Sequence, residues 1–133
     1  MKTIFLALAL FTTAAHAAQD PDRNPCDGVD EDKQTLACSV YSRNTAEQLL
    51  EENFKHLEER VNTQFGANLS QAEDLINKLQ AGRQAWEKLR DADCAVEVFP
   101  SAAGSPAYTI AMNDCIAHTS DERSEYLESV LQE

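Results

Sequence analysis

The sequence predicts a small all-α protein, built as a bundle of about four helices stapled by two disulfides. Apolar residues recur three or four positions apart in several segments, which is the spacing of one helical face. No segment of useful length shows the strict alternation of a strand, and four cysteines lie in a chain of only 133 residues. The connections between the periodic segments are short, as they are in a bundle.

The N-terminus has the layout of a secretory signal over residues 1–17. Lys2 supplies a positive start, residues 4–11 are apolar, and residues 15–17 read Ala-His-Ala, which is an A-x-A cleavage site. The apolar run is far shorter than the ~20 residues of a membrane span. From this layout we expect an exported chain, periplasmic or secreted, with no membrane insertion. The alternative interpretation is an ordinary buried N-terminal helix.

The remaining chain divides into a leader and a domain. Residues 18–25 are polar and contain two prolines, which predicts a flexible leader, and residues 26–133 predict one helical domain. A short first helix is expected over about residues 30–42. It is indicated by three apolar residues at helical spacing, Val29, Leu36 and Val40.

A second helix is expected to begin at Asn44 and Thr45, because Thr45 and Gln48 match a capping box. Gly66 is expected to end it. Its apolar stripe has offsets of four, three, four and four residues and comprises Leu50, Phe54, Leu57, Val61 and Phe65.

A third helix is expected to begin at Ser70, which forms a second capping-box pattern with Glu73, and to end before Pro100. Gly82 costs about 1 kcal/mol of helix propensity relative to alanine, and it would let another helix approach closely. The stripe of this helix comprises Leu75, Leu79, Gly82, Trp86, Leu89 and Val96.

The last helix is expected to follow Ser105, which is a good N-cap and precedes a proline at the first helical position. This helix carries Met112, Cys115, Ile116, Thr119, Tyr126, Leu127, Val130 and Leu131.

The four cysteines all follow the export signal, and their even number predicts two disulfides. Three pairings are open, and we favour the local one, which joins Cys26 to Cys38 and Cys94 to Cys115. A zinc site is the rival interpretation. No C-x-x-C pair or histidine cluster supports it, so we expect no metal.

The charge balance restricts the class of partner. The chain carries 23 acidic and 11 basic residues, a net charge of −12, and loss of Lys2 with the signal brings it near −13. Nucleic acid and anionic membrane surfaces are therefore disfavoured as partners. A basic protein suits this charge, because opposite net charges speed encounter. The alternative is that the acidity serves solubility alone.

Catalytic signatures are absent from the sequence. It contains no phosphate-binding loop, dinucleotide fingerprint, nucleophile elbow or H-E-x-x-H motif, so neither an enzyme nor a cofactor is expected. His56 and His118 are lone residues on separate predicted helices. The dense carboxylates at 51–52, 58–59 and 91–93 are typical of a solvated helix face, although a carboxylate pair with split pKa values is the alternative.

A spacing of four residues recurs in two segments near the C-terminus, and each segment contains one cysteine. The pattern comprises Gln84, Trp86, Arg90, Cys94, Gly104, Ser105, Cys115, Thr119, Arg123 and Leu127. It resembles the lysozyme inhibitor LprI-like family of small bacterial envelope proteins. Members carry Gln-x-x-Trp-x-x-x-Arg-x-x-x-Cys, a Gly-Ser turn and Cys-x-x-x-Thr-x-x-x-Arg. Gln84 departs from that pattern by one position, and Gln80 is another possible counterpart.

The resemblance covers about residues 26–131 and implies a protein-binding module that inhibits lysozyme by occluding the enzyme cleft. It also implies a motif core of Trp86, Thr119 and Leu127. The alternatives are an exported interaction protein with another target and, more remotely, a small hydrolase.

Two arginines and a tryptophan each have two interpretations, partner binding or a structural role. Trp86 lies on the predicted apolar stripe and is expected in the core, whereas an exposed tryptophan would be a binding anchor. Arg90 and Arg123 are candidate partner-binding residues. Each could instead stack on Trp86 or pair with a carboxylate of another helix.

The connection over residues 99–108 is rich in small residues, which let the backbone approach a partner closely. Gly104, Ser105 and Tyr108 are therefore candidate partner-binding residues. The alternative is a simple helix-entry turn capped by Ser105.

Overall fold

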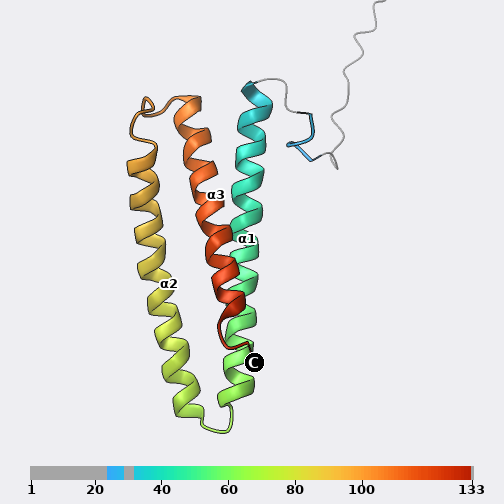
Figure 1. The fold of residues 1–133 in the computed structure, drawn as a ribbon, viewed down its shortest axis with the longest axis vertical. Coiled ribbons are helices and arrows are strands. Elements are labelled where there is room, and N and C mark those ends of the chain that lie inside the picture. The colour runs from blue at the N-terminus through green and yellow to red at the C-terminus, as the bar shows by residue number, and fades with distance from the viewer. Residues whose placement is uncertain (1–23, 29–31, 133) are drawn as a thin grey trace, which may run out of the picture.

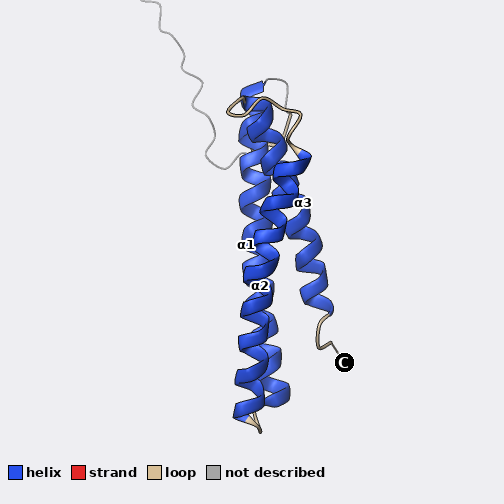
Figure 2. Ribbon diagram, turned by 90° about the vertical axis from the view of Figure 1, so that its left-hand side faces the viewer, coloured by secondary structure: helices blue, strands red, loops and turns tan. Residues whose placement is uncertain are grey.

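Three antiparallel helices make up the computed structural model, which describes residues 24–28 and 32–132 (Figure 1). They are α1 (Asp32–Phe65), α2 (Leu69–Glu97) and α3 (Pro106–Ser129). The predicted signal and most of the predicted leader lie outside the described residues. In the described part no helix combines the length and apolar character needed to cross a membrane. The hairpin of α1 and α2 extends beyond the C-terminal end of α3 (Figures 1 and 2).

The all-α class is confirmed, but the expectation of about four helices is wrong, because the first two predicted helices are one. The predicted break at Asn44 and Thr45 lies inside α1. No proline or glycine occurs between residues 32 and 65, so nothing interrupts the backbone hydrogen bonds. Side chains before and after the predicted break, Ser39 and Asn53, both bond to residues of α3. Packing against one partner therefore favours one continuous helix.

The helix boundaries are set by local chemistry. At Gly66 a Cβ would clash with the backbone carbonyl oxygen of Asn62, so glycine is required directly after α1. The predicted cap at Ser70 is wrong. Asn68 caps α2, because its side chain accepts a hydrogen bond from the backbone N–H of Gln71 at 3.3 Å. The predicted cap Ser105 is confirmed, since its Oγ accepts from a backbone N–H at 3.1 Å.

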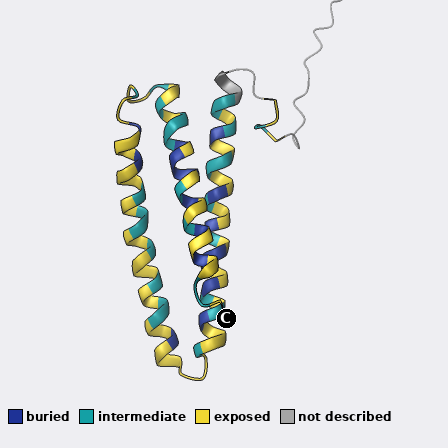
Figure 3. Ribbon diagram, viewed as in Figure 1, coloured by how far each residue is buried: buried dark blue, intermediate teal, exposed yellow. Residues whose placement is uncertain are grey.

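The core lies mainly along the seam between α1 and α3, where buried positions face each other (Figure 3). The main cluster comprises Leu50, Phe54, Leu57 and Leu127, with Leu79, Trp86, Val130 and Leu131 packed against it. A second cluster comprises Cys94, Cys115 and Ile116, with Met112 beside it.

Helix α2 is less buried than its stripe predicted. Only Ala72 and Cys94 are buried on it, whereas Leu89 is 58% exposed and Val96 is 75% exposed. The expected close approach at Gly82 is also wrong, since a Cβ built there meets nothing within 4 Å. Most of the buried apolar side chains lie in the seam between α1 and α3. Helix α2 packs against this seam with only a few of its side chains.

Both disulfides have the local pairing that the sequence favoured. Cys26 is joined to Cys38, and Cys94 is joined to Cys115. The second bridge is buried and ties the C-terminal end of α2 to α3. No cysteine of the chain is left free.

We predict that the purified mature protein contains no reactive thiol. Alkylation under denaturing, non-reducing conditions should add no mass, as measured by intact mass spectrometry. After reduction all four cysteines should be labelled. Two or more labels without reductant would contradict the disulfide framework.

We also predict that Leu57→Ala lowers the free energy of unfolding by about 3 kcal/mol, because it opens a cavity at a fully buried position of α1. Leu89→Ala is the matched control on exposed α2 and should cost less than about 1 kcal/mol. Chemical denaturation measures both values. Equal losses for the two variants would show that the core does not lie on the α1–α3 seam.

Candidate functional site

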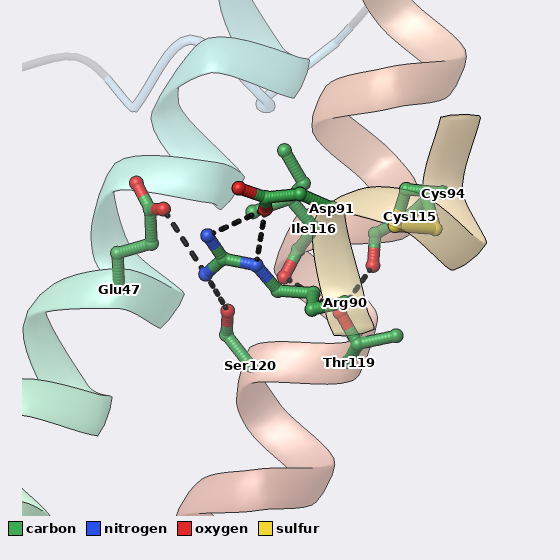
Figure 4. The surroundings of a disulfide bond; sticks show 8 residues. All are labelled: Glu47, Arg90, Asp91, Cys94, Cys115, Ile116, Thr119 and Ser120. Atoms are coloured by element: carbon green, nitrogen blue, oxygen red, sulfur yellow. Dashed lines mark hydrogen bonds and ion pairs between the residues drawn. A yellow bond between two sulfur atoms is a disulfide. The ribbon is translucent and has the colours of Figure 1, made fainter. Parts of the chain in front are cut away.

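Arg90 joins all three helices through one guanidinium (Figure 4). Its side chain comes from α2 and is only 9% exposed. Nη1 donates to Glu47 Oε1 of α1 at 3.3 Å and to Ser120 Oγ of α3 at 3.4 Å. Nε and Nη2 also contact Asp91 Oδ1, at 2.9 and 2.8 Å. Arg90 is therefore held by a structural network.

The network lies next to the buried disulfide because of the sequence spacing. Arg90 and Cys94 are four residues apart on α2, so they lie one turn apart on one face. On α3, Thr119 follows Cys115 by the same interval. The Thr119 hydroxyl donates to the Cys115 carbonyl at 2.9 Å, with a longer contact to the carbonyl of Ile116. Its proton is thus used within its own helix.

A line of polar contacts extends the network along α1 and α3. Glu47 also accepts from Arg43 Nε at 3.2 Å. Arg43 reaches the side-chain oxygen of Asn113 at 3.4 Å, and the Asn113 amide donates to Ser39 Oγ at 3.2 Å. These paired groups fix how the two helices lie against each other.

Beside this network a surface groove of about 320 Å³ runs between α2 and α3. Arg123 lies in it with its Cζ 5.8 Å from the Trp86 ring centroid and 4.6 Å from that of Tyr126. Arg90 also lies over the Trp86 ring, with its Cζ 5.2 Å from the ring centroid. The lining residues are Trp86, Leu89, Arg90, Asp93, Thr119, Glu122, Arg123 and Tyr126.

Trp86 accordingly contacts both the core and the groove. It packs against the main core cluster and is only partly buried, so it also forms part of the groove wall. Leu127, the other apolar member of the motif, is fully buried in the core. The sequence placed Trp86 on the correct helix face, but it contained no signal for the groove that this ring lines.

The connection between α2 and α3 forms a tip at one end of the bundle (Figure 1). Phe99 is 83% exposed there, next to a buried Val98. Backbone bonds at Ser101 and Ser105, to the carbonyls of residues 98 and 102, close two tight turns. Gly104 has φ of +80°, which glycine adopts without strain. The exposed aromatic at the helix end was not singled out from the sequence.

The candidate partner-binding residues therefore fall in two places. Arg90 and Arg123 meet at the groove with Trp86 and Thr119, whereas Gly104, Ser105 and Tyr108 belong to the tip and its helix entry. Ser105 Oγ is engaged as the cap of α3, and Tyr108 is partly buried.

Several charged groups outside these places form surface pairs. Arg83 contacts Glu51 at 2.7 Å and Glu87 at 2.9 Å, and the hydrogen bond to Glu87 raises the pKa of the arginine. Partial burial raises the pKa of the Asp114 carboxyl on α3. Across residues 24–28 and 32–132 no group of His, Cys, Asp or Glu side chains is arranged to hold a metal ion.

Comparison with known proteins gives two matches. The sequence matches the family model described as lysozyme inhibitor LprI over residues 26–127. It is also similar to the crystal structure of a DUF1311 family protein from Pseudomonas putida KT2440. That match has 42% sequence identity and a TM-score of 0.71, and it covers 77% of this chain and 96% of the other. No curated protein matches the sequence.

We predict that Arg90→Gln lowers the free energy of unfolding by about 2 kcal/mol, because the variant loses charged hydrogen bonds to all three helices. Arg83→Gln is the matched control. It removes the same charge from a side chain that is 36% exposed and should cost less than about 1 kcal/mol. Urea denaturation at neutral pH measures the difference. If both variants lose the same stability, Arg90 is not the structural link.

Proposed function

The chain belongs to the lysozyme inhibitor LprI family, and we propose that it is an exported protein-binding module that inhibits a lysozyme by occluding the enzyme cleft. The observation that carries this proposal is the family match, which spans residues 26–127 and includes both cysteine-containing motifs. Two disulfides in a small domain suit an oxidising compartment, and the N-terminal sequence fits an export signal.

We assign the contact with the enzyme to the tip between α2 and α3. Val96 and Phe99, three positions apart in the chain, are both exposed at this end, and large exposed aromatic residues commonly anchor protein interfaces. The segment is braced by the buried Cys94–Cys115 bridge and by its two tight turns. Because a braced tip loses little conformational freedom on binding, it is suited to enter a cleft.

The other candidate residues take supporting roles in this proposal. Ser105 and Gly104 shape the helix entry, because the serine oxygen is used in the cap and the glycine has a positive φ. Arg90 holds α2 in place behind the tip. The tip therefore depends on Phe99 more than on the serine and tyrosine that the sequence suggested.

The net charge supports a basic target. A chain with 23 acidic and 11 basic residues attracts a basic enzyme over long range, which raises the association rate. Added salt should slow association, because the Debye length is only about 8 Å at physiological ionic strength. Contact at the tip is of short range and should survive that screening.

We predict that the mature protein binds a basic lysozyme one to one and inhibits it at about 0.15 M salt, where long-range charge effects are screened. The assay uses a small soluble substrate, so that binding to cell walls plays no part. Phe99→Ala should weaken inhibition about 30-fold, which corresponds to an interface anchor worth about 2 kcal/mol.

Leu69→Ala is the matched control, because Leu69 is 77% exposed at the opposite end of α2. It should leave inhibition unchanged. Equal effects of the two variants would remove the tip from the proposal. Inhibition seen only at low salt, and equalled by an unrelated acidic protein, would contradict inhibition by cleft occlusion.

A further inference from the structure

We propose that the groove between α2 and α3 is a binding site for a carboxylate, with Arg123 as the residue that recognises it. The groove runs along the bundle and has a different lining from the tip, and the inference does not rest on lysozyme inhibition. It rests on the guanidinium of Arg123, which has no hydrogen-bond acceptor among the described residues.

Arg123 lacks a hydrogen-bond acceptor in the described part of the chain. Its Nε is buried and has no partner there, and no carboxylate of residues 24–28 or 32–132 lies within ion-pair distance of it. Arg43, Arg83 and Arg90 each pair with carboxylates, and Arg60 donates to the carbonyls of residues 127 and 130. Among the described arginines, Arg123 is the exception.

Scarcity of acids does not explain this exception, because the chain has about twice as many acidic as basic residues. A buried donor without an acceptor costs free energy, commonly about 1–3 kcal/mol and more for a charged group. The rings of Trp86 and Tyr126 attract the positive charge of Arg123 but offer no oxygen to its N–H donors. Its Nε is thus held in place without an acceptor, whereas its two Nη groups are not buried and remain open to a ligand in the groove.

A carboxylate is the group that completes this site. The planar guanidinium presents its two Nη groups as a fork that matches the two oxygens of a carboxylate. Arg90 is not available for this purpose, since Glu47 and Asp91 already neutralise it. The ligand is therefore expected to depend on Arg123 alone for its charge recognition.

The remaining lining restricts the kind of anion. Asp93 and Glu122 add negative charge to the same groove, so a doubly charged phosphate is repelled more strongly than a single carboxylate. Leu89 and Tyr126 are more than half exposed and offer apolar surface beside the arginine. These features fit a singly charged carboxylate carried on a neutral body, which can be a sugar acid or the C-terminus of a peptide.

Trp86 makes the proposal measurable, because it is the only tryptophan and it lines the groove. Its indole N–H resonance in a ¹⁵N-labelled mature protein should shift when the groove is occupied. Two matched pairs of probes separate the sources. N-acetylmuramic acid differs from N-acetylglucosamine by a lactyl carboxylate, and an acetylated dipeptide acid differs from its amide by the terminal carboxylate.

We expect a saturable shift with the acid of at least one pair and none with its neutral mate or with inorganic phosphate. Arg123→Gln should weaken that binding at least about tenfold, which is the scale of a charge-assisted hydrogen bond. Arg83→Gln removes an equal charge from a groove on another side of α2 and should leave the affinity unchanged.

The sugar pair and the peptide pair decide which source of carboxylate the groove accepts. The assignment is overturned if neither acid gives a saturable shift, if acid and neutral probes bind equally, or if phosphate competes as well as the acids. Binding that survives Arg123→Gln also overturns it. The comparison of acid with neutral probes uses the unaltered protein, so the test does not depend on the folding of a variant.

Discussion

The position of α2 depends on the buried Cys94–Cys115 bridge and on Arg90 beside it. Helices α1 and α3 bury most of the apolar side chains between them, whereas α2 has only two buried residues along its 29 positions. In a domain of this size the core supplies little surplus stability, and a covalent link closing a loop of this length contributes about 3 kcal/mol. Arg90 adds contacts to both other helices at the same level. These two links act together with the buried Val98 to hold the end of α2 that carries the tip.

The same weak packing creates the surfaces on which both proposals rest. Leu89, Val96 and Phe99 remain exposed because α2 contacts the core with a narrow edge. A fourth helix would cover such an edge in a larger bundle. Here the edge borders the groove on one face and continues into the tip. The Cys94–Cys115 bridge therefore has two effects. It fixes the end of α2, and in doing so it also fixes the residues that are exposed there.

Much of the fold could be predicted from residues close in sequence. The stripe from Leu50 to Val61, the Ser105 cap and the local cysteine pairing depend on spacing within a helix or on a short loop, and the structure has each of them. The capping pattern at Thr45 failed because a local hydrogen-bonding preference is weaker than continuous packing on α3. The stripe of α2 was overestimated, because periodicity identifies a face but not the amount of partner surface available to cover it.

The candidate site was harder to predict, because its decisive contacts join distant residues. Arg90 pairs with Glu47 across 43 positions and with Ser120 across 30, so the sequence could offer structural pairing only as one alternative. For Arg123 the informative feature is the missing partner, and an unused donor leaves no mark in the sequence. Only the placement of the neighbouring carboxylates reveals it.

Long-range and short-range electrostatics consequently serve different tasks in this chain. The excess of acidic residues produces a diffuse negative field, which salt screens within about 8 Å at physiological ionic strength. In the proposed carboxylate site Arg123 would act by hydrogen bonds in a groove of the surface, where its Nε is buried and screening is weaker. The negative field opposes the approach of a free anion to the groove, so only a ligand that makes close contact with the guanidinium and its rings overcomes it. If both proposals hold, the field makes the proposed groove site selective at the same time as it favours a basic protein partner at the tip.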